Sequence, residues 1–407
     1  MSIYDKASLI QIPSGYRAGE LYSVIPNSGA GDFTVTGDPE GEATRVNSQG
    51  LIENVSANVP RLDYPFIDGQ VQDCPHLLLE PQRTNYAPYS EDFSSWGDVG
   101  ATITPNAIIS PNGTLNASKL VSTANNWRKS SSFTASSGVT YTVSIYAKLD
   151  TSTSTTTTRL EVYNGAGSLA ANYNLLNETI SNSGFTSVFI EPVEDDWYRI
   201  GGTYTAGGTN NILYIYPSAG YGTAGTMYFW GAQQEAGTYA SSYIATNGSS
   251  VTRTQDKCLN AGSSSLFNDS EGTLFVDWKG FQAGVIDRRI SLSDTSNNVV
   301  SLDLSSVSDR IKGSIYDGTN LRNFLSYGHT HTDRNKIAIR YKSGDSKMFV
   351  NGTEVASTTG TFSLSGLSTL SFSSRNQVAQ FFEGEVYQTM VFNEALSDSE
   401  LETLTTL

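Results

Sequence analysis

Short apolar alternations separated by turn residues recur along residues 117–232, and this pattern constrains the fold more than any other feature of the sequence. In the clearest run, Tyr141, Val143, Ile145 and Ala147 occupy every second position, which is the period of a β-strand with one apolar and one polar face. Comparable runs lie at 117–121, 141–149, 158–163, 187–190, 197–204, 211–216 and 227–232. Short strands with turns between them predict an all-β antiparallel sandwich.

The composition agrees with an all-β chain and argues against several classes of partner. Charged residues make up only 16% of the 407 residues, whereas the 37 glycines and 22 tyrosines suit many tight turns and strands. A formal net charge of −15 repels phosphate backbones, so we expect no nucleic-acid partner. No apolar run is long enough to span a bilayer and the first residues lack the pattern of a secretory signal, so we expect neither membrane insertion nor a signal peptide.

A second β-module is expected after the pattern pauses near 254–262, which we interpret as a domain boundary. Several hairpin-forming runs follow. The clearest alternates over 337–350 and is followed by an Asn-Gly pair, a strong turn signal. Ser397 and Glu400 have the spacing of a capping box, which predicts a short helix near the C-terminus.

Residues 1–73 carry turn residues every few positions, so only short strands are expected there. Two interpretations are compatible with so few core-forming residues. The segment is either an arm that docks to a neighbouring subunit or a particle, or an extended arm that packs on its own module. If it is a docking arm, its deletion should leave the remaining modules folded.

The stretch 74–96, CPHLLLEPQRTNYAPYSEDFSSW, marks the change from the arm to the first module. Its three leucines between two prolines predict a strand that is buried on both faces. Glu80 and Arg83 are expected to form a structural ion pair or to satisfy loop backbone. Cys74 and Cys258 lie at the two ends of the module and are expected to be free thiols, with a bridge between them as the alternative.

The segment LLLEPQRTNYAPYSEDFSSW resembles one in structural proteins of tailed bacteriophages, where it opens a carbohydrate-binding-module-like jelly roll. The resemblance continues through YTVSIYAKLD, DWYRIGGTYTA and MYFWGAQQEAGTYASSYIATNGSSVTRTQD, and upstream through GEATRVNSQGLIENVSANVPRLDY. The later hairpin and the closing run GEVYQTMVFNEALSDSE resemble concanavalin-like or laminin-G-like sandwiches. These resemblances imply an arm at 1–73, a jelly roll at 74–256 and a laminin-G-like sandwich at 257–407.

The same resemblance implies a virion component, either a tail or head fibre or another surface adhesin. Such a protein would assemble with other virion proteins as a homotrimer and bind host surface polysaccharide. It would be made in the host cytoplasm and would need no signal peptide. Two other roles fit the same modules: a capsid- or tail-decorating protein that binds no receptor, and a depolymerase that cleaves surface polysaccharide.

The sequence contains no recognisable catalytic constellation, so we expect no enzyme activity. The E-x-D-x-x-E run of concanavalin-like glycanases is missing. Glu383 and Glu385 alternate within the closing run, where a solvated sheet edge is expected. A carboxylate pair for glycoside hydrolysis would have to come from distant positions. The acids available for it are Glu194, Asp195, Asp196, Asp277 and Asp303.

Sugar binding needs an exposed aromatic face and planar hydrogen-bonding groups. Trp127, Arg128 and Tyr221 lie in expected loops and are the candidate carbohydrate-binding residues, with a structural role as the alternative. The remaining candidates for aromatic stacking are expected in the core instead, because they fall within apolar alternation or the opening motif. These core residues are Trp96, Trp197 and Trp230.

His329 and His331 form a weak candidate metal site, because a spacing of two places both imidazoles on one face of a strand. A polar loop between strands is the favoured interpretation. No cofactor is expected, although the acidic composition leaves room for a structural divalent cation.

Overall fold

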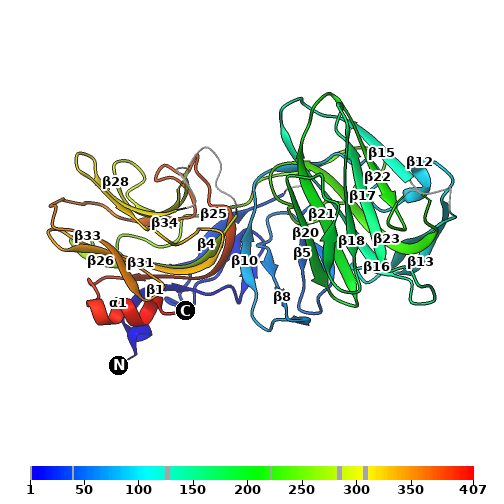
Figure 1. Cartoon of the computed structure of the whole chain (residues 1–407). Helices are drawn as coiled ribbons and strands as arrows, with labels where there is room; N and C mark the ends of the chain where they lie inside the picture. Colours follow the sequence, from blue (N-terminus) through cyan, green and yellow to red (C-terminus); the bar gives the residue numbers. More distant parts are fainter. Residues whose placement is uncertain (1, 39–40, 124–128, 221, 282–286, 306–309) are drawn as a thin grey trace.

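The computed structural model describes every residue except 1, 39–40, 124–128, 221, 282–286 and 306–309, and it contains two β-lobes side by side (Figure 1). The all-β prediction is confirmed. The described chain has a single α-helix, α1 (Asp398–Thr405), which begins at the predicted capping box of Ser397 and Glu400. No helix in the described ranges is long and apolar enough to cross a membrane.

The central lobe consists of two six-stranded antiparallel sheets with an apolar core between them. One sheet has the order β13 (Thr102–Ile109), β14 (Leu115–Ser122), β23 (Gly225–Ala236), β16 (Thr140–Leu149), β21 (Trp197–Thr205) and β20 (Ser187–Val193). The other has the order β12 (Gly97–Asp98), β15 (Lys129–Thr134), β22 (Asn210–Tyr216), β17 (Thr157–Tyr163), β18 (Ser168–Asn174) and β19 (Thr179–Ser181). Every strand expected between 117 and 232 is present.

Strand β16 differs from expectation because both of its faces are buried rather than one. The polar face predicted to meet solvent is covered by a second cluster, in which Tyr146 packs with Trp197, Trp230 and Tyr243. Ile52 of the arm belongs to the same cluster. A strand pattern predicts which face enters the sandwich, but it cannot predict that a distant segment will cover the other face.

The core assignment of the tryptophans is confirmed, since Trp96, Trp197 and Trp230 are all buried. The ring of Trp230 lies 4.5 Å from that of Tyr243 and 5.3 Å from that of Tyr146. We therefore expect Trp230→Ala to lower the free energy of unfolding by about 3–5 kcal/mol through cavity formation. Chemical denaturation of the purified protein would measure this, and a loss below about 1 kcal/mol would contradict the packing described.

The C-terminal lobe also pairs two sheets. The larger has the order β33 (Thr353–Thr358), β32 (Ser346–Val350), β31 (Arg334–Lys342), β26 (Glu271–Gly280), β35 (Gly384–Phe392), β10 (His76–Leu79) and β7 (Leu62–Asp63), with β1 (Ala7–Gln11) also on β35. The smaller has the order β30 (Leu321–Leu325), β29 (Ile311–Asp317), β28 (Asn298–Leu304), β27 (Arg288–Ser293) and β34 (Thr369–Ser371). The expected hairpin is β31–β32, and Asn351 and Gly352 turn the chain into β33 with φ angles of 49° and 79°.

The amino-terminal arm is part of the C-terminal lobe. Its residues Leu9, Leu21 and Phe33 are fully buried in that lobe's core, so the arm packs on the C-terminal lobe rather than on the module that follows it in the sequence. The three-leucine strand is buried on both faces as predicted, but it pairs with β35 rather than opening the central lobe. Because β35 offers hydrogen-bonding groups along both edges, strands from the start of the chain complete the sheet.

Short elements link these parts. They are the 3₁₀ turns η1 (Ile3–Lys6) and η2 (Phe93–Ser95), and the strands β2 (Tyr16–Arg17), β3 (Glu20–Leu21), β4 (Phe33–Thr36), β5 (Thr44–Val46), β6 (Ile52–Asn54), β8 (Phe66–Ile67), β9 (Gln70–Val71), β11 (Arg83–Asn85), β24 (Val251–Arg253) and β25 (Lys257–Leu259). The arm runs between the lobes, and both termini lie at the C-terminal lobe (Figure 1). Cys74 is exposed, Cys258 is buried, and both are free thiols.

Candidate functional site

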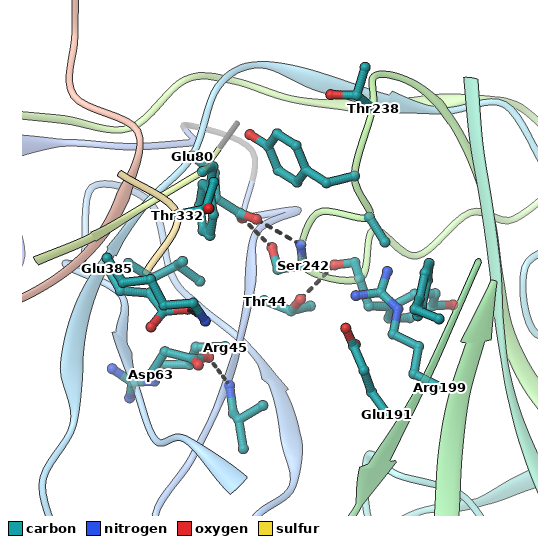
Figure 2. Close-up of a pocket in the computed structure, with 18 of the residues that line it drawn as sticks. Thr44, Arg45, Asp63, Glu80, Glu191, Arg199, Thr238, Ser242, Thr332 and Glu385 are labelled. Atoms are coloured by element: carbon teal, nitrogen blue, oxygen red, sulfur yellow. Dashed lines mark hydrogen bonds and ion pairs between the residues drawn. The ribbon is translucent and has the colours of Figure 1, made fainter. Parts of the chain in front are cut away.

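A cavity of about 640 Å³ lies between the two lobes (Figure 2). The central lobe contributes β20, β21 and the loop 238–243, the C-terminal lobe contributes the ends of β26 and β35, and the arm contributes β5 to β7. The charged side chains that line it are Arg45, Asp63, Glu80, Glu191, Arg199, Lys279 and Glu385. Segments far apart in the sequence thus bring polar groups together at a junction of domains, where ligand sites are common.

Glu191 and Arg199 form one side of the cavity. They are directly opposite each other on the paired strands β20 and β21, which places their side chains on the same face. Arg199 is 8% exposed, and its Nη2 donates to Ser144 Oγ at 3.1 Å and to the carbonyl of Ser241 at 2.7 Å. Glu191 is accessible to solvent within the cavity, and its partial desolvation raises its pKa despite the attraction of Arg199.

Asp63 and Glu385 lie on the opposite side (Figure 2). Oδ1 of Asp63 accepts the amide of Val46 at 2.6 Å, and burial raises the pKa of this carboxyl. The two oxygens of Glu385 accept hydrogen bonds from Lys279 at 3.1 Å and from the hydroxyl of Tyr387 at 2.6 Å. Burial favours protonated Glu385, but His76 and Lys279 outweigh it and lower the pKa.

Glu80 lies in the cavity wall and belongs to a buried ion network that extends behind it. Its Oε2 lies 2.6 Å from Nη1 of Arg61 and 2.8 Å from Nη1 of Arg253, and Arg61 also pairs with Asp256. The amide and hydroxyl of Ser242 donate to its two oxygens at 2.8 Å and 2.7 Å. These contacts join the arm, β10, the loop 238–243 and the segment between the lobes.

Of the two expectations for Glu80 and Arg83, the mutual ion pair is wrong and contact with loop backbone is confirmed. Nη1 of Arg83 donates to the carbonyl of Gln82 at 3.4 Å, and Glu80 accepts the amide of Ser242. Nε of Arg83 lies 3.5 Å from Glu235 of the central lobe, while Glu80 is held by arginines that are distant in the sequence. Proximity along the chain did not decide the pairing. A buried carboxylate is stable only where charged and hydrogen-bonding groups surround it, and these come from distant parts of the chain.

Two aromatic rings, one from each lobe, meet at the cavity. The ring centroids of Tyr239 and Phe281 are 5.0 Å apart, and their planes are inclined by 32°. The guanidinium carbon of Arg83 lies 5.1 Å from the ring centroid of Tyr239, so Arg83 also packs against this aromatic pair. The hydroxyl of Tyr239 is buried and hydrogen-bonds to no described residue. The cavity therefore places an aromatic pair beside its charged side chains.

The residues predicted to bind sugar, Trp127, Arg128 and Tyr221, lie outside the described residues. His329 and His331 lie in the loop between β30 and β31, as the favoured interpretation expected. Ser326 Oγ is 2.8 Å from Nδ1 of His329, and His331 is buried. Across the described ranges, no three His, Cys, Asp or Glu side chains stand close enough to hold a metal ion.

Three of the five acids considered for a distant catalytic pair form separate ion pairs. Asp277 lies 2.9 Å from Arg334, and Asp303 lies 2.6 Å from Arg289. Asp195 lies 2.9 Å from Lys148 at the surface. Glu194 and Asp196 follow the same strand as Glu191, but neither lines the cavity.

The solvated edge expected at Glu383 and Glu385 is wrong. Strand β35 lies inside the sheet between β26 and β10, so Glu383 is buried beside Arg288 at 2.8 Å and Glu385 borders the cavity. The alternation of these glutamates was correct, but the strands that flank β35 come from residues more than 100 positions away.

The cavity-lining residues Glu191, Arg199 and Asp63 were not identified from the sequence. The available signal was a charged residue placed inside an apolar strand, as in WYRI and VFIEPV, since such a charge needs a partner or a ligand. That signal marks a position but not its neighbours. Asp63 reaches the site only because the arm passes between the lobes.

Compared by sequence, the chain matches no protein-family model and no curated protein. Its fold is similar to parts of several solved structures. The carbohydrate-binding module CBM40 of the Ruminococcus gnavus IT-sialidase, bound to α2,3-sialyllactose, is 17% identical, with a TM-score of 0.31, over 34% of this chain and 84% of that module. The NanB sialidase of Streptococcus pneumoniae is 20% identical, with a TM-score of 0.30, over 35% of this chain and 25% of that one.

A third similar structure is domain 4 of AbnA, a GH43 extracellular arabinanase from Geobacillus stearothermophilus in complex with arabinotriose. It is 14% identical, with a TM-score of 0.33, over 37% of this chain and 73% of that chain.

Proposed function

We propose that this chain is a glycan-binding protein and that the cavity between its lobes holds the glycan. The observation that carries the proposal is the convergence at one cavity of charged groups with unused hydrogen-bonding capacity and the aromatic pair Tyr239 and Phe281. A pyranose presents apolar C–H faces and a rim of hydroxyls, and these two surfaces match an aromatic ring beside carboxylate and guanidinium groups.

We further propose that the chain serves at a virion surface, as a tail or head fibre or another adhesin that contacts host polysaccharide. Support comes from the sequence resemblance to structural proteins of tailed phages, which spans much of the first 256 residues. A homotrimer assembled with other virion proteins is part of the same proposal. Because linked sites raise effective concentration, several copies would convert weak single contacts into firm attachment.

The carboxyl groups of the cavity favour a second candidate, hydrolysis of the polysaccharide, because acid–base cleavage uses two carboxyls with different pKa values. We propose binding without cleavage. Glu191 hydrogen-bonds to no described residue, but both oxygens of Glu385 are occupied by Lys279 and Tyr387, and Asp63 is held by the amide of Val46. Hydrolysis would have to rely on Asp63 and Glu191, the cavity carboxyls that form no ion pair with a described lysine or arginine, because Glu385 is paired with Lys279.

Purified protein should be retained on an array of bacterial surface glycans and should release no new reducing ends from them. Phe281→Ala should weaken retention roughly tenfold by removing half of the aromatic surface, while the melting temperature changes little. Absence of retention would favour the decorating role. New reducing ends that disappear in Glu191→Gln would establish the depolymerase role instead.

A further inference from the structure

We infer that the cavity binds uncharged sugars in preference to acidic ones, and that Glu191 and Arg199 hydrogen-bond to a pair of adjacent hydroxyls. This inference rests on the proposed glycan-binding function and specifies the class of glycan.

Glu191 and Arg199 are arranged as a donor and an acceptor held side by side. They are cross-strand neighbours, so their Cβ atoms are separated by about 4.5–5.5 Å. No ion pair within 4.0 Å joins these two described side chains, and Figure 2 shows both beside the open centre of the cavity. Each therefore retains hydrogen-bonding capacity for a third group.

The guanidinium of Arg199 is fixed before any ligand arrives. Nη2 is held by Ser144 and Ser241, and the group lies 5.5 Å from the ring centroid of Tyr146. Nη1, in contrast, donates to no residue that the structure describes, whereas Nε is enclosed by protein and out of reach of a ligand. A rigid donor loses little entropy on binding, so it favours a ligand whose acceptor is already in place.

Adjacent hydroxyls on a sugar ring match this pair chemically. A hydroxyl both donates and accepts, so one can donate to the Glu191 carboxylate while its neighbour accepts from the Arg199 guanidinium. A sugar carboxylate placed at this pair can satisfy only the arginine, because it has no proton to donate to Glu191. The pair therefore favours two adjacent hydroxyls over a carboxylate as the group bound between Glu191 and Arg199.

The remaining charges of the cavity strengthen this discrimination. Lys279 pairs with Glu385, and Arg45 pairs with Glu53 at 2.8 Å. Glu80 and Asp256 together balance the charges of Arg61 and Arg253. These pairs leave Asp63 and Glu191 opposite Arg199. His76 lies 3.6 Å from Asp63, and even when it is protonated the cavity has no excess positive charge. While His76 is neutral, an anionic sugar would consequently meet one uncompensated carboxylate.

The test uses calorimetric titration of the full chain with neutral hexose oligosaccharides and with oligosaccharides of equal length in which a uronic acid replaces one hexose. The wild type should bind the neutral series at least tenfold more tightly. Glu191→Gln should weaken neutral binding about tenfold, because it replaces a charged acceptor with a neutral one, and should narrow the difference between the two series.

Asp196→Asn is the matched control. It removes one carboxylate a few residues away that is exposed and outside the cavity, and asparagine tolerates the φ of 56° found there. It should leave both affinities unchanged. Tighter binding of the acidic series, or equal effects of Glu191→Gln and Asp196→Asn, would overturn the inference while the glycan-binding proposal stands. Absence of binding to either series would overturn both.

Discussion

Deleting residues 1–73 should abolish folding of the C-terminal lobe, the reverse of what a dispensable docking arm would do. The deletion removes strands β1 and β7 from its larger sheet and the side chains of Leu9, Leu21 and Phe33 from its core. Truncating a single such residue costs about 2–5 kcal/mol, and whole domains are stable by only about 5–15 kcal/mol. Calorimetry of the deletion protein should therefore lack the cooperative transition of that lobe.

Point variants within residues 1–73 distinguish the effect of losing buried side chains from the effect of shortening the chain. Leu9→Ala should destabilise the lobe by about 2–5 kcal/mol. Ile67 lies on the β8–β9 hairpin and is 50% exposed. Ile67→Ala should therefore change the free energy of unfolding by less than about 0.5 kcal/mol. If the deletion protein kept all transitions at wild-type temperatures, the arm would be dispensable and its burial would be of no energetic consequence.

Glu80→Ala should destabilise the protein by about 3–5 kcal/mol, because it leaves Arg61 and Arg253 buried with one carboxylate fewer. Both guanidinium groups are almost fully inaccessible to solvent, so water cannot replace the lost partner. Chemical denaturation would measure the loss. Glu20→Ala is a suitable control, since Glu20 pairs with Arg17 at 2.6 Å on the surface and such pairs contribute at most about 1 kcal/mol.

The same network should make the fold sensitive to acid. Burial alone would raise the pKa of Glu80, but Arg253 and Arg61 outweigh it and hold the pKa far below the ordinary glutamate value of 4.5. A carboxyl whose folded pKa is depressed stabilises the fold above its unfolded pKa, and this contribution is lost as the pH falls further. The free energy of unfolding should thus decline below about pH 4.5, with a shallower slope in Glu80→Ala; equal slopes would contradict this.

Sequence patterns identified the local structure of this protein well. Period-two alternation located the strands between 117 and 232, an Asn-Gly pair marked the turn after β32, and a serine and a glutamate three apart marked the start of α1. These features are set by neighbours within a few residues, since side-chain alternation and capping depend on local backbone geometry. They sufficed to predict an all-β fold and the burial of three tryptophans.

Only the tertiary structure decided which strands share a sheet and which charges meet. The arm joins the C-terminal lobe, β10 pairs with β35, and Glu80 pairs with Arg61 and Arg253 rather than with Arg83. The cavity has the same origin, because Asp63, Glu191 and Glu385 come from three separate segments. Unpaired strand edges and buried charges are satisfied by whatever partners the whole fold brings close, and sequence distance carries little information about that choice.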